Sequence, residues 1–318
     1  MADLPLNYGS WIHTNQFLTN LLLGYKLANP VADFVSPGFL VTRPSDKYGK
    51  YNKSINIIYD DEVSGNEEPQ EIDYQVDQVD FSCTERHLAK GVYWRAKRMT
   101  DSPWNLDYDA IRFLKRALTI SREYKVAKIF ASTGFYSANH VKDNSTGGSY
   151  SWQNVNGTPL DDCLNAMSQI VTDTGGYQAN RIVIPTNVAL AMVKTTNWKD
   201  SFKWSSMGFG NGLFSVADGL KNLGLEPMLT AVQGTTSMST VGSDPGMATI
   251  WGNNVLIFYC EPNPSLETRT LSYSPYTLDN VIETIPQKLK KRDLHTIYAE
   301  KIELGVDFQC GYLLQNNN

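Results

Sequence analysis

The chain has 318 residues, of which 42% are apolar and 19% charged, and its formal net charge is −5 at pH 7. This length suits one large or two modest globular domains, and the negative charge argues against a dedicated nucleic-acid binder, which would carry a basic surplus. The charged fraction lies below the roughly 25% of ordinary soluble domains. Because uncharged polar and aromatic groups lose less on desolvation than Lys or Glu, the composition favours extensive contact with other proteins.

No stretch of the sequence predicts export or membrane insertion. The opening residues MADLPLNYGSW do not form a secretory signal, and no apolar run approaches the ~20 residues of a membrane span. The cysteines lie far apart without paired spacing, which indicates reduced thiols in a cytoplasmic setting: Cys83, Cys163, Cys260 and Cys310.

The first third of the chain predicts an arm followed by a long hairpin. Residues 1–35 hold short apolar clusters without a sustained period, so we expect an arm that packs on another surface. Alternating polar and apolar residues then predict two long strands, notably in IDYQVDQVDF, joined by the acidic turn DDEVSGNEEPQE. Two strands alone bury too little surface to be stable in water, so the hairpin needs a partner surface.

A long helix is predicted over about residues 107–130. Asp107 and Asp109 favour its start through the helix dipole, and its length would be about 36 Å. Helical spacing predicts an apolar face of Phe113, Ala117, Ile120, Tyr124 and Ala127. The other side carries cations that either face solvent or pair with the acidic turn of a neighbouring copy: Arg112, Lys115, Arg116, Arg122, Lys125 and Lys128.

Beyond the loop at 143–159, the sequence predicts a compact α/β unit nested inside the other domain. Its elements are a helix with Leu160, Leu164, Met167 and Val171 on one face, the buried strand RIVIP, a helix capped by Thr186 or Asn187, the glycine-rich loop 204–212, the helix LFSVADGLKNLG, and the strands PMLTAV and NVLIFYC. Long strands follow. The basic run KLKKRDLH (288–295) is either a solvated connector between two of them or a contact for an acidic neighbour or nucleic acid.

No pattern of residues predicts catalysis, a cofactor or a metal. MGFGNG lacks the Gly-Lys-Ser/Thr ending of a phosphate loop, and the histidines are scattered: His13, His87, His140 and His295. Cys260, at the end of VLIFYC, is either a buried apolar group or a nucleophile activated by a histidine from elsewhere in the chain. We predict that the protein is not an enzyme and has no cofactor.

Five stretches, in this order, resemble the major capsid proteins of tailed bacteriophages, whose fold is shared with encapsulin shells and the herpesvirus capsid floor. They are PVADFVSPGFLVTRPSDKYGKY, TDSPWNLDYDAIRFLKRALTISREYKVAKIF, RIVIPTNVALAMVKTTNW, MATIWGNNVLIFYCEPNPS and IELGVDFQCGYLLQ. The resemblance covers roughly residues 28–315, and its specificity comes from order and spacing rather than from a strict motif.

The resemblance implies an α+β fold in four parts. These are an N-terminal arm (1–35), an extended β-hairpin loop (47–78), a peripheral domain with a long spine helix (about 107–130) and a long β-sheet (36–46, 79–158 and 262–318), and an inserted α/β axial domain (159–261). In this family, axial domains surround the centre of each capsomer and extended loops overlap neighbouring subunits.

The function implied is that of a structural major capsid protein. It would self-assemble as hexamers and pentamers into an icosahedral virion head that encloses double-stranded DNA without sequence-specific binding. Assembly would occur in the host cytoplasm, with a portal and a decoration protein as further partners. Some relatives begin with a long helical scaffolding region, for which this chain has no room before Val31. A separate scaffolding protein or a matured chain is therefore expected, and the initial Met1 favours the former.

Two sets of residues are expected at subunit contacts, and a third at the capsomer centre. The acidic set is Asp60, Asp61, Glu62, Glu67, Glu68 and Glu71, and the basic set is Arg112, Lys115, Arg116 and Arg122. The resemblance places Trp204, Met207, Phe209 and Asn211 at the capsomer centre. Some relatives also cross-link a lysine of the extended loop to a neighbour. Lys47, Lys50 and Lys53 are available for this here, but the sequence identifies no acceptor.

Two other functions stay open at this point. The fold alone does not separate a phage capsid from an encapsulin-type nanocompartment, which a cargo peptide bound inside the shell would reveal. An unrelated enzyme with Cys260 as nucleophile is the third possibility, and loss of activity in Cys260→Ala would identify it.

Overall fold

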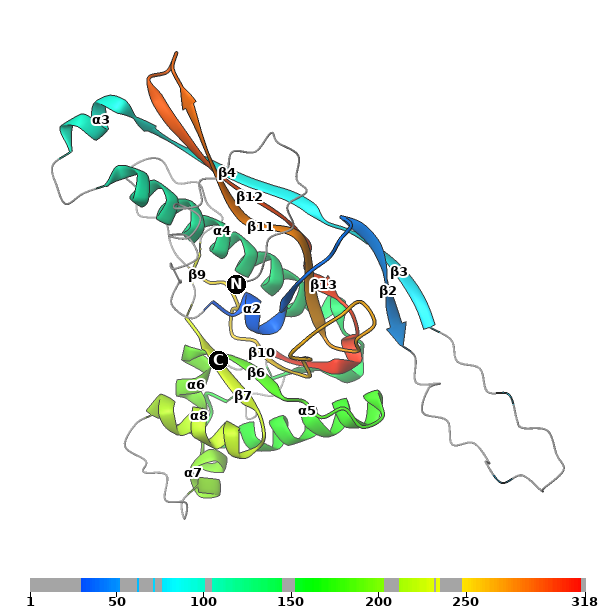
Figure 1. Cartoon of the computed structure of the whole chain (residues 1–318). Coiled ribbons are helices and arrows are strands. Elements are labelled where there is room, and N and C mark those ends of the chain that lie inside the picture. The colour runs from blue at the N-terminus through cyan, green and yellow to red at the C-terminus, as the bar shows by residue number, and fades with distance from the viewer. Residues whose placement is uncertain are drawn as a thin grey trace.

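The protein is described here from a computed structural model, which covers residues 30–51, 62, 71, 76–100, 105–144, 152–202, 212–231, 233–234 and 248–315. Its described strands form two five-stranded sheets and two two-stranded ribbons. Figure 1 shows the long helix α4 (Leu106–Phe130) running beside the first sheet, with the second sheet and its helices at the other end of the molecule. The predicted α+β class is therefore confirmed.

The predicted long helix is confirmed, but its buried face differs from the prediction. The Asn105 side chain caps α4 by accepting hydrogen bonds from the N–H groups of Asp107 and Tyr108. Phe113 and Tyr124, which we expected to be buried, are 57% and 47% exposed. The buried positions are Ala110, Ile111, Leu114, Leu118, Glu123, Val126, Ala127 and Phe130. Both sets have helical spacing, so periodicity alone did not distinguish them.

The first sheet, which we call the peripheral sheet, has the strand order β1-β11-β12-β4, with β13 also paired to β11. Its strands are β1 (Gly38–Leu40), β11 (Ser272–Gln287), β12 (Arg292–Lys301), β4 (Thr84–Tyr93) and β13 (Leu304–Gly305). The α4 side chains Ile111, Leu114 and Leu118 pack on Ile282, Ile297 and Ala299 of β11 and β12. The first half of the basic run, residues 288–291, forms the turn between β11 and β12, and its second half begins β12, in agreement with the prediction of a connector between two strands.

The predicted hairpin is confirmed at its base. β2 (Ser45–Tyr51) pairs antiparallel with β3 (Val76–Ser82) in register from Ser45↔Ser82 to Tyr51↔Val76. Figure 1 shows this ribbon projecting away from α4 and the two large sheets. Most of the acidic turn lies outside the described residues.

The second sheet, which we call the axial sheet, has the order β5-β14-β10-β6-β7. Its strands are β5 (Val141–Asp143), β14 (Gly311–Gln315), β10 (Val255–Phe258), β6 (Arg181–Pro185) and β7 (Glu226–Thr230). The helices around it are α5 (Pro159–Thr174), α6 (Thr186–Met192), α7 (Thr196–Phe202) and α8 (Gly212–Asn222). Tryptophans 152 and 198 and the aliphatic side chains of β6, β10 and the helices form its largest core cluster.

Three predictions about this unit need correction. Leu164 of α5 is 46% exposed, because the helix buries Cys163, Ala166 and Ile170 instead. Pro185 occupies the N-cap position of α6 without a side-chain cap, and the Thr186 hydroxyl donates to the carbonyl of Thr230. The unit is also not self-contained between residues 159 and 261, because β5 and β14, assigned to the peripheral domain, complete its sheet.

Shorter elements connect these parts. They are α2 (Ala32–Val35), α3 (Trp94–Met99), the 3-10 turns η2 (Thr133–Phe135), η3 (Ala138–His140) and η6 (Phe308–Cys310), and the ribbon of β8 (Gln233–Gly234) and β9 (Ala248–Thr249). Among the helices that the structure describes, none is long and apolar enough to cross a membrane.

Candidate functional site

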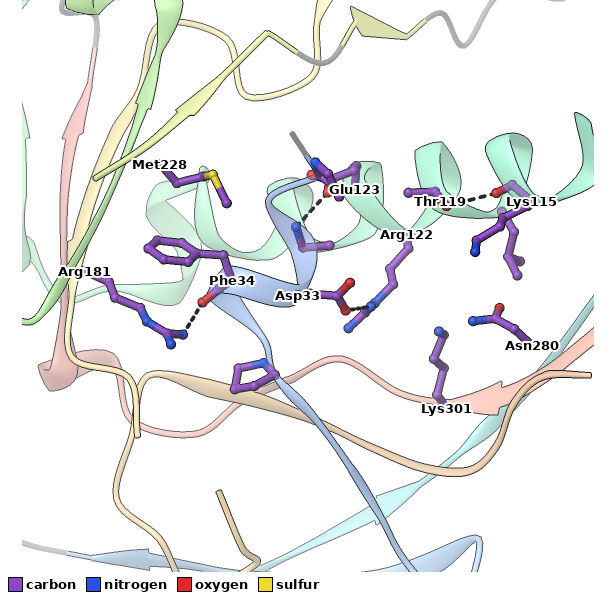
Figure 2. A pocket seen from close by; sticks show the side chains of 14 residues that line it. Asp33, Phe34, Lys115, Thr119, Arg122, Glu123, Arg181, Met228, Asn280 and Lys301 are labelled. Atoms are coloured by element: carbon purple, nitrogen blue, oxygen red, sulfur yellow. Dashed lines mark hydrogen bonds and ion pairs between the residues drawn. The ribbon is translucent and has the colours of Figure 1, made fainter. Parts of the chain in front are cut away.

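The segment at residues 30–37, which we call the α2 segment, is held against α4 by a buried carboxylate. Glu123 Oε1 accepts the backbone N–H groups of Val31 and Ala32 at 2.6 and 2.7 Å, and Oε2 accepts the indole N–H of Trp251 at 3.3 Å (Figure 2 shows Glu123 beside this segment). The first N–H groups of a helix have no partner within it. Glu123 therefore caps α2 from a neighbouring helix and links three segments that are distant in sequence.

The environment of Glu123 perturbs its ionisation. Burial raises the pKa of the carboxyl group, while the hydrogen bonds from Ala32, Trp251 and Val31 and the charge of Arg122 act in the opposite direction. A carboxyl group whose pKa is raised on folding favours the folded state below its unfolded pKa. This contribution is lost as the pH rises through the folded pKa.

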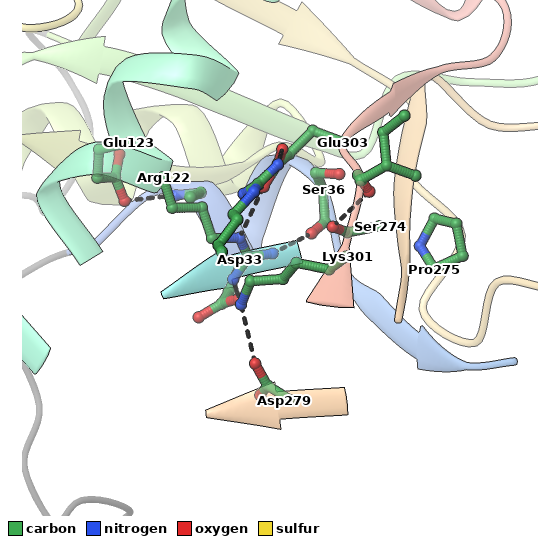
Figure 3. Close-up of polar contacts among 12 residues, drawn as sticks. Asp33, Ser36, Arg122, Glu123, Ser274, Pro275, Asp279, Lys301 and Glu303 are labelled. Atoms are coloured by element: carbon green, nitrogen blue, oxygen red, sulfur yellow. Dashed lines mark hydrogen bonds and ion pairs between the residues drawn. The ribbon is translucent and has the colours of Figure 1, made fainter. Parts of the chain in front are cut away.

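A second buried carboxylate, Glu303, joins the peripheral sheet to α4. It accepts two hydrogen bonds from the Arg86 guanidinium, at 2.7 and 2.5 Å, and lies 3.6 Å from Nε of Arg122 (Figure 3). Burial acts to raise the pKa of Glu303. The hydrogen bonds and charge of Arg86, with the charges of Arg122 and Lys301, outweigh burial and hold this pKa below its usual value.

Arg122 has a different role from the one that the sequence suggested. Its side chain is only 12% exposed, it pairs with Asp33, and its Nη2 donates to the carbonyl of Ser36 at 3.0 Å. Arg122 therefore binds the α2 segment of its own chain. Its two terminal nitrogens are engaged within its own subunit and its side chain is largely buried, so Arg122 is poorly placed for a contact between subunits.

A cavity of about 590 Å³ lies between the α2 segment, α4 and strands of both sheets (Figure 2). Its charged lining residues are Asp33, Lys115, Arg122, Glu123, Arg181 and Lys301. No histidine or cysteine is among the described residues that line it. The described lining of the cavity therefore holds no cysteine–histidine pair.

Cys260 is part of the same junction, as a packing residue. It is fully buried, its Sγ lies 3.2 Å from Nη1 of Arg181, and that nitrogen also donates to the carbonyl of Phe34 at 2.7 Å. Burial raises the pKa of the thiol, although the nearby Arg181 charge opposes this. A buried thiol with a raised pKa is a poor nucleophile. In the described structure its polar contacts come from residues 180, 181, 261 and 270, and none of these is a histidine.

The two buried histidines have structural partners. His140 contacts Asp173 and the carbonyl of Gly311, both at 2.8 Å, and His295 contacts Asp107 at 2.7 Å and Thr284 at 3.0 Å. These pairs tie η3 to α5 and β14, and β12 to the start of α4. Within the described ranges, no three His, Cys, Asp or Glu side chains come together as a metal site would require.

The other predicted contact residues are placed only in part. Glu62, Glu71, Arg112 and Arg116 are exposed, and Lys115 is half-buried. Lys47 lies 3.8 Å from Asp80 across the β2–β3 ribbon. The following lie outside the described residues: Lys53, Asp60, Asp61, Glu67, Glu68, Trp204, Met207, Phe209 and Asn211.

Sequence reasoning missed Glu123 and Glu303. One signal for the first was present, since Glu123 is the only acidic residue between Asp109 and the end of α4 at Phe130. A lone carboxylate on a strongly basic helix face has several possible partners. The pattern does not reveal that the backbone of residues 31 and 32 is among them.

Comparison with solved structures identifies the fold of the chain. No family model and no curated protein matches the chain. The crystal structure of a phage-related protein from Bordetella bronchiseptica RB50 has a TM-score of 0.75 and 18% identity, and the match covers 96% of this chain and 98% of that one. The capsid of cyanophage P-SCSP1u has a TM-score of 0.58 and 10% identity, with coverage of 91% and 88%.

The chain has the phage capsid fold. A virus-like particle from Pyrococcus furiosus shares it, with a TM-score of 0.52 and 12% identity over 94% of this chain and 96% of that one. The predicted resemblance to the major capsid fold is thereby confirmed over nearly the whole chain. In this capsid fold, the buried groups around Glu123, Glu303 and Cys260 are structural ties between the α2 segment and the two sheets.

Proposed function

We propose that the protein is the major capsid protein of a tailed phage, which assembles as hexamers and pentamers into an icosahedral head around double-stranded DNA. The observation that carries this proposal is the match along almost the entire length of the chain to a phage-related protein and to a phage capsid.

The surface of the peripheral sheet supports a role in assembly. β4 is an edge strand in the described sheet, and seven of its ten residues are exposed. Large apolar side chains are also exposed on this sheet and its helices, at Leu40, Leu88, Tyr93, Met99, Phe113, Tyr124, Ile285 and Leu289. Natural proteins protect such edges, and exposed apolar groups mark contact surfaces. Neighbouring subunits of a shell would cover both.

The parts of the fold take the following roles in this proposal. Residues 1–35 act as an arm and residues 47–78 as an extended loop over a neighbour. The axial domain, residues 159–261 with β5 and β14 added, surrounds the capsomer centre with Trp204, Met207, Phe209 and Asn211. A shell sums many individually modest contacts of this kind into a stable container.

The acidic turn is the proposed electrostatic contact between subunits. Replacing Asp60, Asp61 and Glu62 with serine removes three negative charges, so we expect impaired assembly of a subunit that still folds. Thermal unfolding checks the fold, and sedimentation measures the yield of particles. Normal particles from this variant would refute the role of the turn.

The proposed partners are a scaffolding protein during assembly, a portal, and a decoration protein on the finished head. Assembly would take place in the host cytoplasm. The packaged DNA would be enclosed without sequence-specific contacts, in keeping with the net charge of −5.

An encapsulin-type nanocompartment is the second candidate, because the fold alone does not separate it from a phage head. The two functions differ in what the shell contains. Nuclease-resistant DNA inside particles from infected or induced cells supports the phage head. A co-purifying enzyme bound to the inner wall supports the compartment.

Negative-stain imaging of the purified protein, alone and with the product of a neighbouring scaffold gene, tests the proposal. We expect uniform closed particles with icosahedral outlines. A subunit that stays a small monomer under every condition would contradict it.

A further inference from the structure

Five exposed cations gather at the far end of the peripheral sheet. Arg95 and Arg98 belong to α3, while Lys288, Lys290 and Lys291 form the turn between β11 and β12. We call these five residues the distal basic surface. Figure 1 shows α3 and the β11–β12 turn at the same end of the molecule, beyond the start of α4.

Several contacts fix α3 beside this turn. The N–H of Trp94 donates to the carbonyl of Lys291 at 3.0 Å, and its indole N–H donates to Asp293 of β12 at 2.9 Å. Lys97 bridges Asp293 and Asp107 at 2.7 and 2.6 Å. The Arg292 side chain of β12 also lies over Gly91 of β4, where an added Cβ would be 2.9 Å from it.

The positive charge of this surface is not neutralised within the described part of the chain. Asp107 and Asp293, the acidic residues tied to α3, are bound by Lys97, and Asp107 also contacts His295. None of the described carboxylates pairs with any of the five cations. Placing like charges together without counter-charges costs free energy, so an acidic partner would be attracted here.

Apolar side chains lie among these cations. Leu289, at the tip of the turn, is fully exposed, and Met99 of α3 and Tyr93 at the end of β4 are 70% and 56% exposed. Phosphate backbones offer little to such side chains. A protein segment that combines carboxylates with a few apolar groups fits this mixture better.

The chain itself contains such a segment. Residues 60–71, DDEVSGNEEPQE, hold six carboxylates and one valine and have no lysine or arginine. We propose that the distal basic surface binds the acidic segment 60–71 of a second copy of this chain. This inference deepens the proposed function and rests on it, since it names the surface that receives the hairpin turn of a neighbouring subunit.

The spine-helix cations, which the sequence suggested as receptors, compare unfavourably with this surface. Arg122 is bound to Asp33 and Ser36 of its own chain, and Lys115 is half-buried. Only Arg112 and Arg116 of that set are exposed. The distal basic surface offers five exposed cations to six carboxylates, which is the better electrostatic match.

A charge exchange tests the contact. Lys288→Glu with Lys290→Glu, and separately Asp60→Lys with Asp61→Lys, should each lower the particle yield roughly tenfold by creating repulsion. A chain that carries all four substitutions restores attraction and should assemble within about threefold of the original. No rescue in the four-substitution chain would overturn the proposal. The matched control is Lys194→Glu with Lys199→Glu, which makes the same charge change at two exposed lysines elsewhere. If this control pair lowers the particle yield, adding Asp60→Lys with Asp61→Lys should not restore it.

A binding measurement separates this inference from the proposed function. A fluorescent peptide with the sequence DDEVSGNEEPQE should bind the unassembled full chain at low salt and be released as salt screens the charges. Lys288→Glu with Lys290→Glu should abolish binding, whereas the control pair should retain it. Peptide binding without particles would uphold the contact and contradict the shell. Particles without peptide binding, or binding of a short DNA duplex in place of the peptide, would overturn the contact alone.

Discussion

The two five-stranded sheets of this protein differ in how much of their surface the subunit itself covers. All four residues of β10 in the axial sheet are buried, and the helices around that sheet share its largest core. Only one of the ten residues of β4 in the peripheral sheet is buried. An axial sheet covered by its own helices can hold its shape alone, whereas the peripheral sheet leaves surface that only other molecules can cover.

The largest expected effect contrasts the same substitution in the two regions. Phe258→Ala in β10 removes a fully buried ring and should lower the free energy of unfolding by about 3–5 kcal/mol. Phe113→Ala on α4 removes a ring that is mostly exposed and packed under Lys90, so we expect a loss below about 1 kcal/mol. Denaturant unfolding of the unassembled subunit measures both. Equal losses of unfolding free energy in the two variants would contradict the idea that the subunit covers the axial sheet but leaves the peripheral region open.

The second largest loss of stability is expected at the junction between the two sheets, where Glu123 holds the α2 segment. Glu123→Ala leaves the N–H groups of Val31 and Ala32 and the indole of Trp251 without their acceptor, so we expect a loss of about 3 kcal/mol. Glu123→Gln retains one oxygen for the backbone and should lose less. Limited proteolysis near residue 30 should become faster in the alanine variant only. If both variants are equally stable and resistant, the carboxylate does not hold the α2 segment.

The ionisation of Glu123 makes a separate prediction about pH. Burial raises its pKa in the folded state, so the stability of the original protein relative to Glu123→Gln should fall as the pH rises through that pKa. The difference should level off at higher pH, where the carboxyl is ionised in both states. Unfolding of the two proteins from acidic to neutral pH measures it. A difference that grows with rising pH would mean that the hydrogen bonds outweigh burial.

Cys260 should show a smaller effect. Cys260→Ala removes one buried sulfur atom, and we expect a loss of about 1 kcal/mol. Because burial raises the pKa of its thiol, it should react with a thiol reagent only on unfolding. Mass spectrometry after brief labelling of the native protein locates the modified cysteines. Rapid labelling of Cys260 would revive a role as a nucleophile.

The smallest effect on folding is expected at the tip of the peripheral sheet. Leu289 is fully exposed, so Leu289→Ser should leave the melting temperature of the subunit unchanged. If this tip is a contact surface, the same substitution lowers the yield of particles. A lower melting temperature would show instead that Leu289 packs within its own subunit.

Order and spacing along the chain were enough to predict the architecture, but not the details of packing. The helix at 107–130, the strand RIVIP and the turn after β11 follow from periodicity and turn residues, which act locally. The predicted buried faces of α4 and α5 were wrong in part, at Phe113, Tyr124 and Leu164, because neighbouring sets of side chains in each helix have the same spacing. The choice between them depends on which strands lie beneath.

The ties at the junction could not be predicted for a related reason. Glu123 binds backbone groups 91 and 92 residues away, and Arg86 reaches Glu303 over 217 residues. β5 and β14 enter the axial sheet from segments that the sequence assigned elsewhere. Such contacts are set by the three-dimensional path of the chain, and no local pattern records them.

Hydrogen exchange tests most directly whether other subunits complete the peripheral sheet. The β4 amides that point away from β12 should exchange rapidly in the unassembled chain and become strongly protected in particles, while those of β10 are protected in both. This pattern would show that assembly covers the edge that the subunit leaves open. Unchanged exchange of β4 in assembled particles would contradict the account.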